Sequence, residues 1–287
     1  MEYGSPSVFQ CDSDIVKNAY QNSDNYLIEY DNNQSEQNCV IYFSSNDIYY
    51  PNSEAAFRRA ILEQNKFEWY ATRVPSAKKH IFIRDIQKQW YLTGVNSLIN
   101  TPEKLLTFLK TETAGYIVTT LGSSAGGFAA VLFGSLLGAR LVLSFNGQFQ
   151  VASLLKTSNE SINPVLFRFY RKDKFIEYFD VKSFMGDCSN IFYFYSTDSA
   201  WDAEQRNHIQ DKNVNVIGFK TSHHGIPFLK CNLPIILNMP TDTLMRFSGN
   251  SFFPLLFSVR LIGWMDTVVG LFRQIISKMK NKIGFLR

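Results

Sequence analysis

The stretch from Tyr116 to Gly138 constrains the fold more than any other part of the chain. Residues 116–121 are β-branched, aromatic or apolar, and they predict a fully buried strand. They run directly into the turn Gly122-Ser-Ser-Ala-Gly-Gly127 and then into an apolar, Ala-rich segment that predicts a helix. Strand and helix can pass this closely only where the flanking residues are small. The pattern G-x-S-x-G between them therefore predicts a sharp strand–turn–helix junction.

Ser124 stands at the centre of this turn and is the candidate nucleophile. The turn strains its backbone, and the helix that follows directs N–H groups and partial positive charge toward the place where an oxyanion would form. Gly- and Ser-rich turns are common, so a purely structural turn is the alternative. The strand–turn–helix context favours catalysis.

Strands alternate with helices along the rest of the chain, and the apolar strands imply a mainly parallel sheet with helices on both faces. Ligands bind at the carboxyl ends of the strands in such a sheet. The further strands are predicted around Val8–Cys11, Tyr26–Tyr30, Cys39–Phe43, His80–Ile83, Arg140–Phe145, Asn190–Tyr195 and Val214–Phe219. Helices are predicted over Ser53–Gln64, Glu103–Lys110 and Trp201–Gln210.

A serine hydroxyl needs a base, and histidine has a suitable pKa. Of the four histidines, His80 lies at the start of its strand, away from the reactive edge, and His208 lies within a helix. His223 and His224 directly follow the last strand. We favour His224 because Gly225 gives the loop freedom to turn the ring toward the serine, and His223 is the alternative.

The acid that orients the base is expected after the preceding strand. Asp198 comes first after that strand and is our choice, whereas Asp202 falls in the first turn of the next helix, where an acid is favourable in any case. The chain order Ser124, Asp198, His224 is that of the α/β-hydrolase fold, which we therefore predict.

Two backbone donors are needed for an oxyanion hole. One is expected at Ala125, after the nucleophile, and the other in the loop after an earlier strand, at Ser45 or Asn46. A neighbouring loop carries three side chains that could touch the substrate: Asp85, Trp90 and Tyr91. For Trp90 and Tyr91 the alternative is that they pack the loop down.

Two segments depart from the alternating pattern. Residues 151–188 are rich in aromatic and basic residues and predict a helical insertion, or lid, in a catalytic domain that spans residues 1–246. Residues 247–287 form a tail in which apolar positions recur every three or four residues from Leu261, which predicts an amphipathic helix. Its basic end suits an anionic membrane surface, but the helix could equally dock on the core or pair with a second copy.

Composition excludes several classes of function. The net charge of +4 is too small and dispersed for a nucleic-acid binder. The four cysteines are scattered and no histidine lies at ligand spacing, so we expect reduced thiols and no metal site. The first residues have neither a basic segment nor an apolar one that would mark a secretory signal. We therefore expect a cytoplasmic protein that can attach peripherally to the inner face of the membrane.

Several phrases across residues 39–230 together resemble the α/β-hydrolase-fold proteins of bacterial capsule biosynthesis. The phrases are Tyr42-Phe-Ser-Ser-Asn46, Phe82-Ile-Arg-Asp85 with Gln89-Trp-Tyr91, Gly122-Ser-Ser-Ala-Gly-Gly127 and His224-Gly225. This group includes capsular polysaccharide O-acetyltransferases, which move acetyl from acetyl-CoA to a sugar hydroxyl through a serine ester. The resemblance implies a polysaccharide acceptor, acetyl-CoA as donor, and nucleophile, acid and base at Ser124, Asp198 and His224.

Three functions remain open on the sequence. Transfer of acetyl to a glycan is the leading hypothesis, in which basic residues of the insertion would meet phosphates of CoA or of the glycan: Arg168, Arg171 and Lys172. A carboxylesterase or deacetylase that acts on a glycan ester needs the same triad. A non-catalytic scaffold of a capsule assembly complex, tethered by the tail, is the alternative from another class. A homo-oligomer is compatible with each of the three functions.

Overall fold

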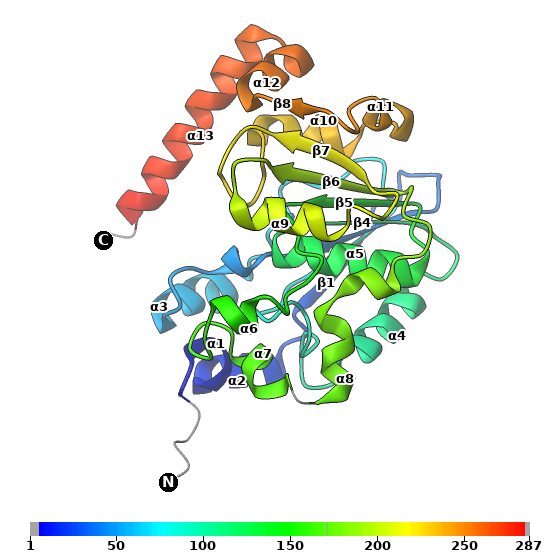
Figure 1. Cartoon of the computed structure of the whole chain (residues 1–287). Coiled ribbons are helices and arrows are strands. Elements are labelled where there is room, and N and C mark those ends of the chain that lie inside the picture. The colour runs from blue at the N-terminus through cyan, green and yellow to red at the C-terminus, as the bar shows by residue number, and fades with distance from the viewer. Residues whose placement is uncertain (1–5, 171, 285–287) are drawn as a thin grey trace.

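The computed structural model describes residues 6–170 and 172–284, without the side chains of residues 173, 174 and 277–284. Within these residues, eight strands form one sheet in the order β1-β3-β2-β4-β5-β6-β7-β8 (Figure 1). The strands are β1 (Tyr26–Tyr30), β2 (Asn38–Phe43), β3 (Lys79–Ile83), β4 (Ile117–Ser123), β5 (Leu141–Phe145), β6 (Ile191–Ser196), β7 (Asn215–Phe219) and β8 (Ser251–Phe252).

The sheet is parallel except at one edge. Strand β1 runs antiparallel to β3, and every other neighbouring pair is parallel. The central strand β4 lies between β2 and β5, with Leu121 opposite Tyr42 on one side and Leu143 on the other. The predicted mainly parallel sheet is confirmed, and the two-residue edge strand β8 was not foreseen.

Both faces of the sheet are covered, which explains why its strands are apolar throughout. Along β2, Ile41 and Phe43 belong to one apolar cluster, whereas Val40 and Tyr42 belong to a second cluster on the opposite face. The first face carries α4 (Pro102–Glu112), α5 (Ala125–Leu137) and α9 (Ala200–His208). The second face carries α10 (Leu233–Leu237), α11 (Thr241–Met245) and α12 (Pro254–Ile262).

The N-terminal segment corrects one prediction. The strand expected around Val8–Cys11 is the short helix α1 (Phe9–Asp12), in which the Asp12 carboxylate accepts the Val8 N–H at 2.7 Å. The Phe9 ring packs edge-on against a third apolar cluster instead of entering the sheet. Around that cluster lie α2 (Asp14–Asn22), the 3₁₀ turn η1 (Asn46–Ile48), α3 (Glu54–Phe57) and the π-helical turn η2 (Arg58–Glu63), and the last two confirm the helix predicted over 53–64.

The segment between β5 and β6 is helical, as expected. It comprises α6 (Leu154–Thr157), α7 (Pro164–Phe169), α8 (Asp173–Ile176) and the 3₁₀ turns η3 (Glu177–Phe179) and η4 (Val181–Phe184). Leu166, Phe179 and Val181 are buried in the first cluster, so this segment packs as part of the main core. The division of the chain at residue 246 stays a prediction.

The C-terminal segment forms two helices rather than one. Helix α12 ends at Gly263, whose φ of +81° breaks the run, and α13 (Trp264–Gly284) follows as a long rod beside the body of the molecule (Figure 1). Much of its apolar surface faces solvent, and Trp264 and Phe272 are 65% and 62% exposed. None of the helices in the described part of the chain has the length and hydropathy needed to cross a membrane.

Candidate active site

The turn after β4 has the strained geometry that its sequence predicts. Ser124 has φ 53° and ψ −121°, a conformation rare for a residue with a side chain, and its N–H donates to the Phe145 carbonyl at 2.9 Å. This bond anchors the serine to the neighbouring strand β5. The hydroxyl therefore stands at the carboxyl edge of the sheet on a fixed support.

Glycines around the serine allow backbones to approach each other. A Cβ on Gly122 would lie 2.1 Å from the Gly126 carbonyl oxygen, and one on Gly126 would lie 2.2 Å from that of Phe43. The start of α5 is thus pressed against both β4 and the end of β2. As a result, the loop that begins at Ser44 lies beside the nucleophile.

A histidine and an acid complete a hydrogen-bonded chain with the serine. His224 Nε2 lies 2.8 Å from Ser124 Oγ, and His224 Nδ1 lies 2.9 Å from Asp202 Oδ1. The Asp202 side chain is fully buried, whereas that of His224 is 32% exposed. In this arrangement Nδ1 carries the proton toward the carboxylate, and Nε2 can accept the proton of the serine.

The loop that carries His224 is fixed through its neighbours. The backbone carbonyl of His223 accepts hydrogen bonds from Ser196 Oγ at 2.6 Å and Asn146 Nδ2 at 3.1 Å. The Trp201 ring stacks on the imidazole of His224, with centroids 5.0 Å apart. Two strand ends and one helix therefore position the base, and the His223 ring, the sequence-based alternative, lines the same pocket without being the group bonded to Ser124.

The prediction that Asp198 is the acid that orients His224 is wrong. Asp198 is exposed, its N–H donates to the Thr221 carbonyl at 3.1 Å, and its carboxylate accepts from Thr197 Oγ1 at 2.9 Å. Its peptide is tied to the edge of β7, which leaves the carboxylate in solvent. Helix α9 begins after the Ser199 cap and brings Asp202, in its first turn, to the imidazole instead.

Two backbone N–H groups near the serine are free to donate a hydrogen bond. Neither the Asn46 nor the Ala125 N–H has an acceptor among the described residues, and both belong to the segments that the sequence assigns to the oxyanion hole. The Ser45 N–H, by contrast, donates to Glu68 at 2.5 Å. We therefore assign the two candidate oxyanion donors to Ala125 and Asn46, with Ser45 as the residue that holds the loop.

Glu68 was not foreseen from the sequence. It belongs to an irregular segment that Trp69 attaches to the end of β2, since the buried indole donates to the Phe43 carbonyl at 2.9 Å. Glu68 lines the same pocket as Ser124, and burial raises the pKa of its carboxyl despite the opposing hydrogen bonds from Ser45. Nothing in the pattern around residue 68 marks it, because no predicted strand or helix carries it.

The three residues predicted on the loop after β3 are not among those that line the pocket at Ser124. The Asp85 carboxylate is buried and accepts four backbone N–H groups of its own loop, including those of Gln89 at 2.6 Å and Tyr91 at 3.0 Å. Trp90 donates to Gln148 at 2.9 Å, and the Tyr91 hydroxyl donates to the Ser44 carbonyl at 2.8 Å. Of the two interpretations left open, packing is the one observed.

The basic residues of the insertion also lie elsewhere. Arg168 pairs with Asp12 at 2.7 Å and Glu160 at 2.9 Å, and these carboxylates satisfy its charge. The Lys172 ammonium lies 4.4 Å from the centre of the Phe169 ring. Arg171 lies outside the described residues. Neither described cation is among the residues that line the pocket at Ser124.

The pocket at the serine is small. Its volume is about 160 Å³, roughly the space of five water molecules. It is lined by Ser45, Asn46, Asp47, Glu68, Ser123, Ser124, His223, His224, Gly225, Ile226 and Lys230. A cavity of this size suits a short acyl group next to the hydroxyl. In the described part of the chain, no three His, Cys, Asp or Glu side chains gather as a metal site would require.

Comparison with solved structures gives the fold. The capsule O-acetyltransferase of Neisseria meningitidis serogroup A aligns with TM-score 0.50 and 14% identity, over 78% of this chain and 92% of that one. A variant of that enzyme in complex with CoA aligns with TM-score 0.49 and 15% identity, over 77% and 92%. An S-formylglutathione hydrolase from Staphylococcus aureus aligns with TM-score 0.44 and 8% identity, over 73% and 84%.

No protein-family model matches the chain, and no curated protein matches it either. The structural likeness confirms the resemblance to capsule O-acetyltransferases at the level of the fold. The chain has the α/β-hydrolase fold, as its order of nucleophile, acid and base predicts.

Proposed function

We propose that the protein is a serine-dependent acyltransferase that moves an acetyl group from acetyl-CoA to a hydroxyl of a capsular polysaccharide. The observation that carries this proposal is the chain of hydrogen bonds from Asp202 through His224 to Ser124, at 2.9 and 2.8 Å. The choice of donor and acceptor follows the resemblance in sequence to the capsule O-acetyltransferases.

In the first half-reaction, Ser124 Oγ attacks the thioester carbonyl as its proton passes to His224 Nε2. The Ala125 and Asn46 N–H groups bind the negative oxygen of the tetrahedral intermediate. The C–S bond then breaks, the thiolate takes the proton from His224, and an acetyl ester remains on the serine. Asp202 stabilises the imidazolium in between.

In the second half-reaction, an acceptor hydroxyl gives its proton to His224 and attacks the acetyl-serine carbonyl. The bond to Ser124 Oγ breaks as that oxygen regains the proton, and the new ester leaves. Water in place of the sugar hydroxyl would give hydrolysis by the same steps. The 32% exposure of the His224 side chain is the observation that favours this second candidate, an esterase or deacetylase acting on glycan esters.

The test uses purified protein with acetyl-CoA, with and without capsule oligosaccharide, and follows free thiol and acetylated product. Transfer predicts thiol release that depends on the acceptor and equals the acetylated sugar in amount. Release without acceptor supports hydrolysis. Capsule acetylation that is unchanged in cells whose only copy of the protein is the Ser124→Ala variant would instead support a non-catalytic scaffold.

The remaining partners are also proposals. The exposed apolar side chains of α13, among them Trp264 and Phe272, support attachment to the inner face of an anionic membrane or to a second copy of the chain. Flotation with anionic and with neutral vesicles tests the membrane, and sedimentation tests the second copy. The lysines predicted at the basic end of the tail lie outside the described side chains.

A further inference from the structure

A second and larger hollow adjoins the pocket at Ser124. Its volume is about 810 Å³, and it lies between α13 and the segment formed by the 3₁₀ turn η5 (Lys230–Asn232) and α10. Lys230 lines both this groove and the catalytic pocket. The two spaces therefore share one lining residue, which follows His224 by six positions along the chain.

Close packing seats α13 on this segment. A Cβ on Gly270 would lie 2.6 Å from Cys231 Sγ, so only a glycine lets the helix lie so close to η5. Asp266 and Arg273 lie about one turn before and after this contact, and both line the groove. The helix thus forms one wall of the groove, with a cation on one side of the contact and an acid on the other.

The walls combine apolar surface with a few polar groups. Lys230 and Arg273 are exposed, and neither has an acidic partner within the described residues. Gln274 also lines the groove, and its side-chain oxygen is buried with no hydrogen-bond partner among these residues. The apolar part of the lining is Pro234, Ile235, Ile262 and Val269.

We propose that this groove holds the phosphate-bearing nucleotide end of the acyl donor, while the thioester reaches Ser124. This inference rests on the proposed function. The two cations match the phosphates, and the acid and the amide can bind hydroxyl and amino groups of the nucleotide. A donor whose thioester is joined to its phosphates by a long neutral arm fits this arrangement, because Lys230 lines both the small pocket at Ser124 and the larger groove.

The test compares two donors in the same variants. Acetyl-CoA carries the nucleotide and p-nitrophenyl acetate does not, so Lys230→Ala and Arg273→Ala should each raise the KM for acetyl-CoA about tenfold. The ratio of kcat/KM for acetyl-CoA to that for p-nitrophenyl acetate should fall by a similar factor. Arg273→Glu should raise the KM for acetyl-CoA further than Arg273→Ala does.

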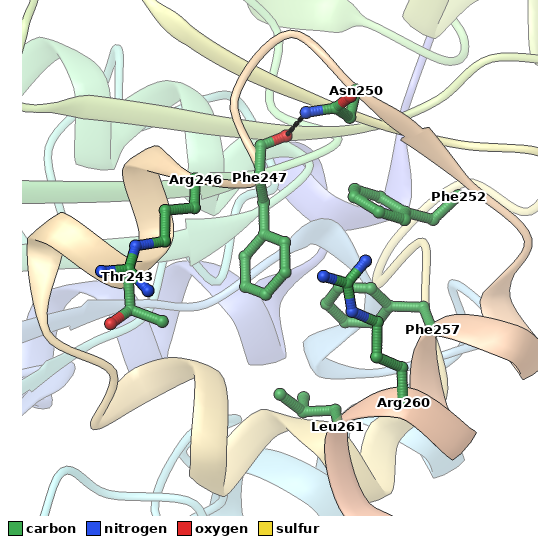
Figure 2. Close-up of a pocket in the computed structure, with 8 residues that line it drawn as sticks. All are labelled: Thr243, Arg246, Phe247, Asn250, Phe252, Phe257, Arg260 and Leu261. Atoms are coloured by element: carbon green, nitrogen blue, oxygen red, sulfur yellow. Dashed lines mark hydrogen bonds between the residues drawn. The ribbon is translucent and has the colours of Figure 1, made fainter.

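Arg260→Ala is the matched control, since Arg260 is also an exposed arginine of the C-terminal helix pair. It lines a separate hollow near β8 with Arg246 and three phenylalanines (Figure 2). The proposal expects both kinetic constants of this variant to equal those of the wild type. An effect of Arg260→Ala equal to that of Arg273→Ala would mean a nonspecific effect of charge and would overturn the proposal.

Calorimetry with CoA separates this inference from the proposed function, since binding requires no chemistry. Binding that weakens about tenfold in Arg273→Ala supports the groove even if no acceptor is ever acetylated. A KM for acetyl-CoA and a CoA affinity unchanged in both alanine variants would refute the groove, while the triad could still react with p-nitrophenyl acetate. If the variants lose only their binding to anionic vesicles, the cations serve a lipid surface and the proposal is wrong.

Discussion

Two turns at the carboxyl edge of the sheet both contain non-glycine residues with positive φ, but they differ in what their polar atoms contact. In the loop after β3, Lys88, Trp90 and Tyr91 have φ of 59°, 53° and 62°, and in the turn after β4, Ser124 has φ of 53°. The polar groups of the first loop are buried and bonded within the protein. The hydroxyl of Ser124 faces a pocket. A positive φ alone therefore does not identify a reactive site, whereas Ser124 combines it with a hydroxyl that both contacts a histidine and lines a pocket.

Removal of the serine hydroxyl should produce the largest effect. Ser124→Ala should lower the turnover of acetyl-CoA and of p-nitrophenyl acetate by about 10⁴-fold, because the attacking atom is lost. The thermal unfolding temperature should change little. Activity above a tenth of the wild-type value would show that Ser124, like the residues of the loop after β3, has a structural role and is not the nucleophile.

The next largest effect should distinguish Asp202 from Asp198, the two acids on either side of Ser199. Asp202→Asn should lower kcat about 10³-fold, since an amide no longer holds the imidazole in its working tautomer. Asp198→Asn is the matched control and should keep wild-type kcat, because its carboxylate lies in solvent. Steady-state kinetics with p-nitrophenyl acetate measures both. The reverse ranking would contradict the geometry.

A substitution in the loop after β3 should change the stability of the protein. Asp85→Ala leaves four buried N–H groups of its loop without their acceptor, so the free energy of unfolding should fall by about 3 kcal/mol. Asp198→Ala, at an exposed position, should change it by less than about 0.5 kcal/mol. Urea titrations give both values. A stable Asp85→Ala variant with a raised KM would instead support the interpretation that Asp85 contacts the substrate.

The smallest expected effect concerns Glu68 and pH. An ionised Glu68 opposes the negative charge that develops near the Asn46 N–H, whereas glutamine keeps a hydrogen-bond acceptor for Ser45 without the charge. Burial raises the pKa of this carboxyl, so in the wild type the charge appears only as the pH rises through that raised pKa. The kcat of Glu68→Gln divided by that of the wild type should therefore be near one at low pH.

The same ratio should climb to about threefold once the wild-type carboxyl is ionised. Parallel pH profiles of the two proteins with one ester substrate measure it. Glu68→Ala serves as the comparison variant, since it removes the acceptor as well and should lower kcat. A ratio that falls with rising pH would mean that the charge of Glu68 assists the reaction.

The sequence predicts those features that depend on periodicity and turn chemistry. The apolar strands, the turn at Ser124 and the loop with His224 all follow from local pattern. The choice between Asp198 and Asp202 depended on where α9 starts, because its cap Ser199 directly follows Asp198 and precedes Asp202 by three residues, and the sequence alone does not fix that start. The helix at Phe9 was missed because a segment as short as Val8–Cys11, with three apolar residues, fits either state.

Glu68 could not be predicted for a different reason. It reaches the site through the hydrogen bond from Trp69 to the end of β2, a contact between segments distant in sequence. Periodicity carries no information about such a contact, because it depends on how an irregular segment lies against the finished sheet. Residues of this kind are found only once the fold is known.

The short edge strand β8 has a further consequence for the architecture of the candidate site. It covers β7 at Gly218 and Phe219 only, so the strand that leads to His224 is second from the rim, whereas the serine follows β4 in the middle of the sheet. His224 thus follows a strand near the edge of the sheet, whereas Ser124 follows a central strand. Local unfolding of β7 and β8 would move His224 away from Ser124 while the centre of the sheet stayed folded, and the protein would then be inactive.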